Sequence, residues 1–173
     1  MKSKSFALLL ILALLSITAC SADQETPIGL GIGRMAPDFT IGLYGGESVT
    51  LSELRGKPAI LNFYTTWCPP CLQEMPDFQE VFEEYGERLN LLGISVGETP
   101  AVVDEFLENS TFTYPMAYDT DGAVSYIYSI EFIPQTWVID SEGIIIAYIP
   151  GGTNAGFLRQ ALSQAFAEAQ SEE

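Results

Sequence analysis

The stretch AILNFYTTWCPPC, residues 59–71, decides how this chain folds and which chemistry it carries. Its first part, residues 59–65, is apolar enough to predict a buried strand. Apolar residues then recur at helical spacing from Leu72 to Tyr85, so the two cysteines stand where a strand passes into a helix. At such a junction the unpaired N–H groups and the positive end of the helix dipole favour a thiolate at Cys68. Two thiols three residues apart can alternate between dithiol and disulfide, which moves two electrons without a cofactor.

A zinc site and a purely structural disulfide are the alternative roles for Cys68 and Cys71. Structural zinc takes four Cys or His ligands, usually as two spaced pairs, and the chain has no His and only one further cysteine, Cys20. A disulfide that closes so short a loop removes little chain entropy. Prolines at a helix entrance and the strand–CxxC–helix setting favour a redox function instead. No metal or cofactor is therefore expected.

The N-terminus has the pattern of a bacterial lipoprotein signal. Two lysines precede the apolar residues 6–15, a stretch too short to remain as a span across a bilayer core of about 30 Å. The sequence ITAC, residues 17–20, resembles a lipobox, in which cleavage falls just before a cysteine that then becomes lipid-modified. We therefore expect a signal peptide over residues 1–19 and attachment of Cys20 to a lipid bilayer. An incidental cysteine in an ordinary signal peptide is the alternative.

The rest of the chain is predicted to form one domain behind a tether. Residues 20–33 are rich in Gly and small polar residues, which predicts a lipid-anchored cysteine followed by a flexible linker. Residues 34–170 suffice for a single globular domain, and residues 171–173 form a tail. The formal charge is −16, and cleavage would make it −18 because two lysines leave with the signal. Such an acidic surface argues against nucleic acid and suits either a basic protein partner or solubility in a salty medium.

The order of the predicted elements indicates an α/β protein. Strands are predicted at residues 38–42 and 48–51 as an N-terminal β-hairpin, and then at 59–65, 89–96, 114–118, 135–140 and 144–149. Helices are predicted at residues 72–85, 100–108, 122–128 and 155–169. The inner face of the second helix is expected to consist of Ala101, Val102, Phe106 and Leu107. Strands mixed with crossover helices specify a three-layer α/β/α sandwich with helices on both faces of a mixed sheet.

Four separate motifs carry a family resemblance. They are Ala36-Pro37-Asp38-Phe39, Asn62-Phe63 with Trp67-Cys68-Pro69-Pro70-Cys71, Glu74-Met75-Pro76, and Ile133-Pro134-Gln135-Thr136. Together they resemble the thioredoxin superfamily, and more narrowly its extracytoplasmic TlpA/ResA/CcmG-type members. The resemblance extends from the first motif through the final helix. It implies a thioredoxin-like fold in which a central strand and helix, between residues 89 and 118, are an insertion.

The resemblance also implies roles for the residues of the site. Cys68 would be the exposed attacking thiol, and Cys71 the buried thiol that resolves the mixed disulfide. Pro134 would be the cis-proline of the family, with a simple turn proline as the alternative. The substrate-docking surface would comprise Trp67, Pro69, Pro70, Ile133 and Pro134. Ordinary packing is the alternative role for Trp67 and Ile133.

Glu74 lies about one helical turn after Cys71. It matches the acidic residue that sits near the thiols of ResA-like proteins, where a carboxylate raises a thiol pKa and can relay a proton. Asn62 stands at the strand position that holds a buried acid in thioredoxin, which leaves Glu74 as the nearest candidate for proton transfer. A solvated residue placed for the helix dipole is the alternative. Pro69 and Pro70 remove N–H donors from the helix start, which leaves the reduction potential open.

These features predict a membrane-anchored thiol-disulfide oxidoreductase of the bacterial cell envelope. By resemblance it would reduce disulfides in exported substrates such as apocytochrome c, with electrons from a membrane donor of the CcdA/DsbD type. A net thiol oxidase is one alternative. A peroxiredoxin-like peroxidase is another, since Thr65 fits the pattern Pro-x-x-x-Thr-x-x-Cys although Leu61 stands at its proline position. A Sco-like copper chaperone is disfavoured, because such proteins use CxxxC and a distant His that this chain lacks.

Overall fold

A five-stranded mixed sheet forms the centre of the domain in a computed structural model, which describes residues 26–169. The strands are β3 (Ala59–Tyr64), β4 (Asn90–Val96), β5 (Met116–Asp119), β6 (Gln135–Ile139) and β7 (Ile145–Pro150), arranged in the order β5-β4-β3-β6-β7. Strands β3, β4 and β5 run parallel to one another, whereas β6 pairs antiparallel with both β3 and β7. The predicted mixed sheet is therefore confirmed.

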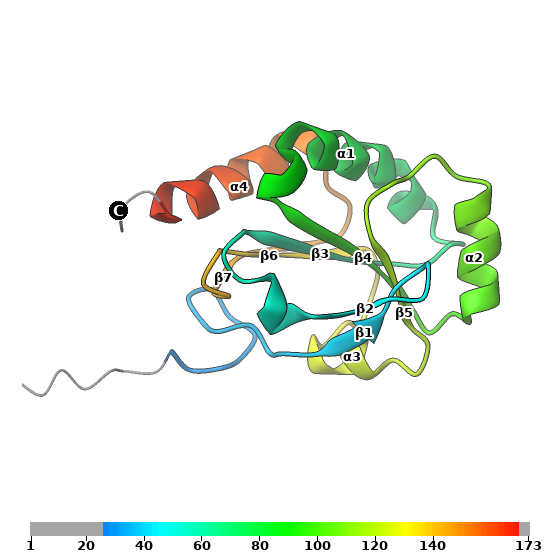
Figure 1. Cartoon of the computed structure of the whole chain (residues 1–173), viewed down its shortest axis with the longest axis horizontal. Helices are drawn as coiled ribbons and strands as arrows, with labels where there is room; N and C mark the ends of the chain where they lie inside the picture. The colour runs from blue at the N-terminus through cyan, green and yellow to red at the C-terminus, as the bar shows by residue number, and fades with distance from the viewer. Residues whose placement is uncertain (1–25, 170–173) are drawn as a thin grey trace, which may run out of the picture.

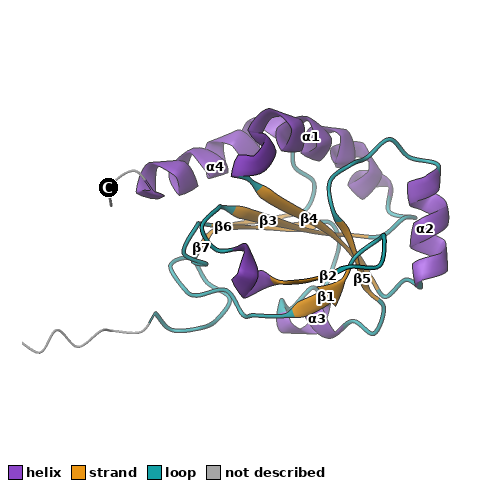
Figure 2. Ribbon diagram, in the orientation of Figure 1, coloured by secondary structure: helices purple, strands orange, loops and turns teal. Residues whose placement is uncertain are grey.

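Helices and a small hairpin cover the two faces of this sheet (Figure 1). Helices α1 (Pro69–Tyr85) and α4 (Ala155–Ala169) lie side by side on one face, and α2 (Pro100–Glu108) contributes to the same core. Helix α3 (Ala123–Ile127) and the antiparallel hairpin of β1 (Thr40–Gly42) and β2 (Ser48–Thr50) lie on the other face (Figure 2). This arrangement is the predicted thioredoxin-like sandwich, with its N-terminal hairpin and its inserted strand and helix.

Two hydrophobic cores hold the layers together. The core beneath α1 and α4 includes Met75, Phe78, Val81, Leu158 and Leu162. The core on the hairpin side includes Phe39, Leu61, Phe63, Tyr128 and Trp137. All six residues of β3 are buried, because both faces of this central strand are covered. The loop that follows β3 thus starts from a strand that is buried along its whole length.

Helix α1 begins three residues earlier than its apolar pattern predicted, at Pro69 instead of Leu72. Prolines fit the first positions of a helix, because the N–H groups of the first turn have no partner within the helix. Cys68 consequently becomes the residue that caps the helix, and Cys71 lies within its first turn.

Helix α2 has the predicted bounds but not the predicted inner face. Val103 and Leu107, one turn apart, are its buried residues. Ala101 and Val102 are exposed and Phe106 is half-buried, so the expected face was wrong at two of its four positions. The segment is apolar on more than one side, and its sequence alone did not fix which side turns inward.

The segment before the hairpin joins the domain earlier than expected. The backbone N–H of Gly29 donates to the carbonyl of Met35 at 3.0 Å, and that of Gly33 donates to Ile145 at 2.8 Å. Residues 28–33, expected as the end of a flexible linker, are therefore bound to the domain, because their backbone groups find partners there.

The predicted signal peptide and Cys20 lie within residues 1–25, outside the described residues, as does the predicted tail at 171–173. Acylation of Cys20 thus stays a prediction. Across residues 26–169, no helix combines the length and the apolar character that crossing a membrane requires.

Candidate active site

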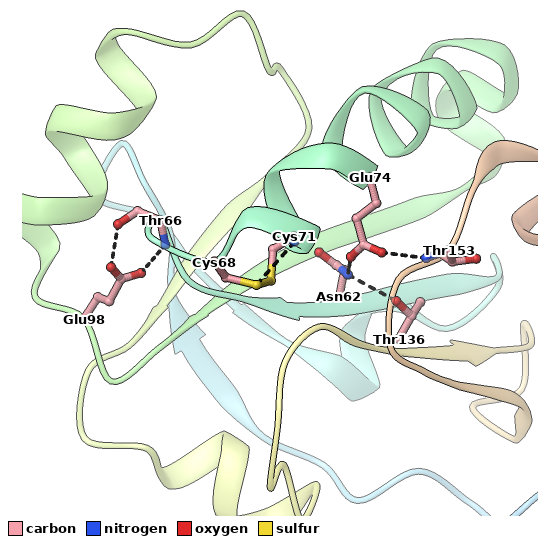
Figure 3. The surroundings of a disulfide bond; sticks show 8 residues. All are labelled: Asn62, Thr66, Cys68, Cys71, Glu74, Glu98, Thr136 and Thr153. Carbon is pink, nitrogen blue, oxygen red and sulfur yellow. Dashed lines mark hydrogen bonds between the residues drawn. A yellow bond between two sulfur atoms is a disulfide. The ribbon is translucent and has the colours of Figure 1, made fainter.

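The two cysteines meet at the N-terminus of α1, directly after the central strand (Figure 3). Their sulfurs form a disulfide, with the Cα atoms 5.3 Å apart. Cys68 caps the helix, and its Sγ accepts a hydrogen bond from the backbone N–H of Cys71 at 3.3 Å. Pro69 and Pro70 fill the first two helical positions and carry no N–H. Of the first three helical residues, Cys71 is therefore the one that can donate to this sulfur.

Cys68 is more buried than the resemblance implied. Its exposed fraction is 3%, and that of Cys71 is 0%. The expectation of an exposed Cys68 is wrong for the disulfide form, because its sulfur is bonded to one that lies in the core beneath α1. Cys68 nevertheless remains the more accessible of the two, which agrees with its expected role as the attacking thiol.

A groove with an apolar lining adjoins the loop that carries Cys68. Its lining consists of Thr65, Trp67, Val96, Ile130, Glu131, Phe132 and Ile133. Trp67 is 70% exposed and Phe132 is 51% exposed, so ordinary packing is the wrong explanation for Trp67. Ile133 is half-buried at the groove. The structure thus brings Trp67 and Ile133 together on one surface, although they are 66 positions apart in the sequence.

The predicted cis-proline is confirmed, because the Ile133–Pro134 peptide bond is cis. Pro134 itself is buried, whereas Pro69 and Pro70 are exposed at the start of α1. The docking roles of these residues stay predictions. The groove also contains residues that the sequence did not predict, which come from β4 and from the loop before β6: Val96, Ile130, Glu131 and Phe132.

Glu74 points from α1 toward the central strand and is 2% exposed (Figure 3). Its Oε1 accepts a hydrogen bond from Asn62 Nδ2, and its Oε2 accepts one from the backbone N–H of Thr153, both at 2.8 Å. The alternative of a solvated residue is therefore wrong. Burial raises the pKa of Glu74 from 4.5 to about 7, against the two hydrogen bonds, which lower it, and with a smaller raising effect from Asp77. A carboxyl group with this pKa can both take up and release a proton near neutral pH.

Asn62 connects Glu74 to β6. Its Nδ2 also donates to Thr136 Oγ1 at 3.1 Å, while its Oδ1 is buried without a partner. Rotation of the amide by 180° would place Oδ1 where it can accept from a protonated Glu74 and from the Thr136 hydroxyl. The side chain of Asn62 can therefore accommodate Glu74 in either protonation state.

A second buried carboxylate holds the loop that precedes the cysteines. Glu98, which is 8% exposed, follows β4 and accepts three hydrogen bonds. They come from the backbone N–H of Thr66 at 2.8 Å, the hydroxyl of Thr66 at 2.6 Å and the hydroxyl of Ser95 at 2.7 Å. Neither Glu98 nor Thr66 could be predicted as a site residue, because no local sequence pattern links residues so far apart in the chain.

A thioredoxin-like sandwich with a disulfide-forming CxxC pair at the start of its first long helix defines a class of proteins that exchange thiols and disulfides. The profile of the AhpC/TSA family matches residues 32–148, and the chain belongs to this family. It is 34% identical over 152 residues to the thiol-disulfide oxidoreductase ResA of Oceanobacillus iheyensis. The aligned region covers 85% of this chain and 79% of that protein. The protein is thus a ResA-like thiol-disulfide oxidoreductase, as the resemblance predicted.

Solved structures agree with this assignment. StoA from Bacillus subtilis superposes with a TM-score of 0.65 and 26% identity, over 73% of this chain and 96% of that one. The pneumococcal exposed lipoprotein thioredoxin Etrx1 from Streptococcus pneumoniae gives a TM-score of 0.68 and 25% identity, over 74% of this chain and 99% of that one. The thioredoxin-like fold class is therefore shown by known structures as well as by the topology.

Proposed function

We propose that this enzyme is a lipid-anchored reductase on the extracytoplasmic side of a bacterial membrane, and that it reduces disulfides in exported proteins such as apocytochrome c. The Cys68 thiolate attacks a substrate disulfide, forming a mixed disulfide and releasing one substrate thiolate. Cys71 then attacks the Cys68 sulfur, which releases the second substrate thiolate and leaves the Cys68–Cys71 disulfide seen in the structure. Two electrons pass to the substrate, and a membrane donor of the CcdA/DsbD type then supplies two new electrons, which reduce the Cys68–Cys71 disulfide again.

Glu74 is proposed to serve the second of these attacks. Cys71 must lose its proton before it can act as a nucleophile, and its surroundings are fully buried. Glu74 lies one turn further along the same helix, and its pKa of about 7 suits a group that accepts this proton and later returns it. Substrate side chains are proposed to dock in the groove beside Trp67 and Ile133.

The observation that carries the direction of electron flow is the scarcity of N–H donors at Cys68. Strong oxidants of this fold have a stabilised thiolate, which stabilises the reduced form and raises the reduction potential. Here Pro69 and Pro70 offer no N–H, so Cys71 alone donates to the sulfur from the first three helical residues. A weakly stabilised thiolate favours the disulfide form and therefore a reductant.

The reduction potential tests this direction. Equilibration of the full chain against defined thiol buffers, with Cys68→Ser as the control, should give a value near or below that of thioredoxin, about −270 mV. A value near that of DsbA, about −120 mV, would mean a thiol oxidase instead. Peroxide consumption by the same reduced preparation would identify a peroxidase.

Lipid anchoring is supported by the ITAC motif and by the likeness to a structure described as an exposed lipoprotein thioredoxin. In bacteria labelled with a fatty-acid analogue, the wild-type chain should carry label and sediment with membranes. Cys20→Ala should lose both properties, whereas Cys71→Ser should keep them. Equal labelling of Cys20→Ala and the wild type would exclude the anchor.

A further inference from the structure

We infer that Glu98 is a positioning residue, which fixes the loop before α1 so that Cys68 keeps its place at the helix terminus. Its carboxylate binds Thr66 twice, once through the backbone N–H and once through the hydroxyl. Thr66 lies only two residues before Cys68. Figure 3 shows the pair on the side of the disulfide opposite Glu74.

The loop depends on Thr66 because its neighbours offer few other ties. Trp67 is 70% exposed, and the hydroxyl of Thr65 is buried without a partner. The backbone N–H of Cys68 donates to the carbonyl of Thr65 at 3.3 Å, which closes the turn upon itself. Apart from the bonds of Cys68 to the start of α1, the hydrogen bonds that connect the described residues of this turn to another element are the two from Thr66 to Glu98.

Glu98 is itself held by the central sheet. Ser95, which donates to Glu98 Oε2 at 2.7 Å, pairs with Tyr64 in the parallel ladder between β4 and β3. Gly97 then turns the chain with a φ of +69°, a conformation that residues with a Cβ rarely adopt. This turn sets Glu98 beside the end of β3, and the backbone N–H of Gly97 is fixed by the carbonyl of Asp119 at 2.9 Å. The carboxylate of Glu98 therefore connects Ser95 in the sheet to Thr66 in the loop.

The hydrogen bonds of Glu98 to Thr66 and Ser95 also connect two sides of the apolar groove. Thr65 and Trp67, on either side of Thr66, line it, and so does Val96, the neighbour of Ser95. Glu98 thus holds both the reacting sulfur and part of the surface beside it. A small shift of a reacting group from its productive position can cost a large rate factor, up to about 10²-fold for a displacement of 1 Å.

Two substitutions separate this positioning role from the negative charge of Glu98. Glu98→Gln can keep all three hydrogen bonds, because its amide oxygen can accept from the Thr66 N–H and the Ser95 hydroxyl while its amide N–H donates to the Thr66 hydroxyl. Glu98→Ala removes the three bonds. Both variants remove the charge, so any difference in Cys68 reactivity between them measures the effect of the hydrogen bonds to the loop.

The experiment measures alkylation of Cys68 by iodoacetamide in the reduced full chain, followed by peptide mass between pH 5 and 10. At pH 7, Glu98→Ala should react on the order of tenfold more slowly than Glu98→Gln, and its apparent Cys68 pKa should be higher. Rates and apparent pKa values that agree within about twofold between the two variants would overturn the proposal.

Ser95→Ala is the matched control, because it removes one hydrogen bond from Glu98 but leaves both bonds to Thr66. Its Cys68 should be alkylated at the wild-type rate. A decrease in rate equal to that of Glu98→Ala would assign the effect to the end of β4 and refute the proposal. Should Glu98→Ala fail to fold, as judged by near-UV circular dichroism, Thr66→Val replaces it. That variant loses the hydroxyl bond alone and should slow alkylation by about threefold, whereas an unchanged rate would refute the proposal.

Discussion

Glu74→Gln should change how the stability of the oxidised protein depends on pH. Wild-type Glu74 has a pKa of about 7 in the fold, against 4.5 for the ordinary carboxyl group, chiefly because it is buried. Between these values the folded state binds more protons than the unfolded state, so the free energy of unfolding falls as pH rises. A rise in pKa from 4.5 to about 7 corresponds to about 3 kcal/mol of stability, which is fully present below pH 4.5 and is lost as the pH rises to 7 and above. Gln cannot ionise and has no such loss.

The variant should also fit the site. The backbone N–H of Thr153 can still donate to the amide oxygen of Gln, and the new amide N–H can donate to Asn62 Oδ1 if the Asn62 amide rotates. Thr136 can then donate its hydroxyl to the same oxygen. Any fixed cost of this rearrangement is independent of pH and does not affect the slope.

Urea unfolding of the oxidised full chain, followed at pH 5 to 8.5, measures the effect. As the pH increases across this range, the free energy of unfolding of Glu74→Gln should rise by roughly 2 to 3 kcal/mol relative to that of the wild type. Glu83→Gln, an exposed glutamate on the same helix, is the control and should run parallel to the wild type. A Glu74→Gln curve that also runs parallel would refute the argument, since it would mean that Glu74 has an ordinary pKa in the fold.

Three further predictions follow from single positions. Cys71→Ser should accumulate a mixed disulfide between Cys68 and a substrate protein on non-reducing gels, whereas Cys68→Ser should not; trapping by Cys68→Ser would reverse the assigned roles. Gly93→Ala should lower the free energy of unfolding by about 1–3 kcal/mol, because its methyl group would overlap Met116 Sδ, and an unchanged denaturation midpoint would contradict this. Tyr64→Phe should raise the free energy of unfolding by about 1 kcal/mol, because the Tyr64 hydroxyl is buried without a partner; a loss of stability on urea titration would show that bound water satisfies it.

The parts of the fold that could be predicted are those whose signals are local. A mostly apolar strand, the CxxC pair and a helical repeat follow one another within residues 59–85, so β3, the thiol pair and α1 were predicted together. The proline at 134 needed more than a local signal: its cis bond was predicted from a motif resemblance and is confirmed. The final hairpin was predicted because two strand-like runs flank a short Ser-Glu-Gly turn.

The parts that could not be predicted depend on contacts between distant residues. Glu98 and Thr66 are separated by 32 positions, and each alone resembles an ordinary polar residue of a loop. The burial of Glu74 depends on Asn62 in β3 and on Thr153 before α4, so the helical position alone left a solvated side chain open. The exposure of Cys68 was expected from the family resemblance and was wrong for the disulfide form, because the sequence does not show that its sulfur is bonded to the buried sulfur of Cys71.

The two buried carboxylates flank the cysteine pair, and their proposed roles can be tested separately. Glu74 is proposed to transfer a proton, and its raised pKa can be measured in the oxidised protein, where neither Cys68 nor Cys71 titrates. Glu98 concerns position: its effect is measured in the reduced protein, as the difference between two uncharged variants. The direction of electron flow rests on a third feature, the N–H groups that Pro69 and Pro70 lack. An oxidising potential would therefore refute the proposed reductase and leave both carboxylate arguments intact, because neither depends on which redox form is the more stable.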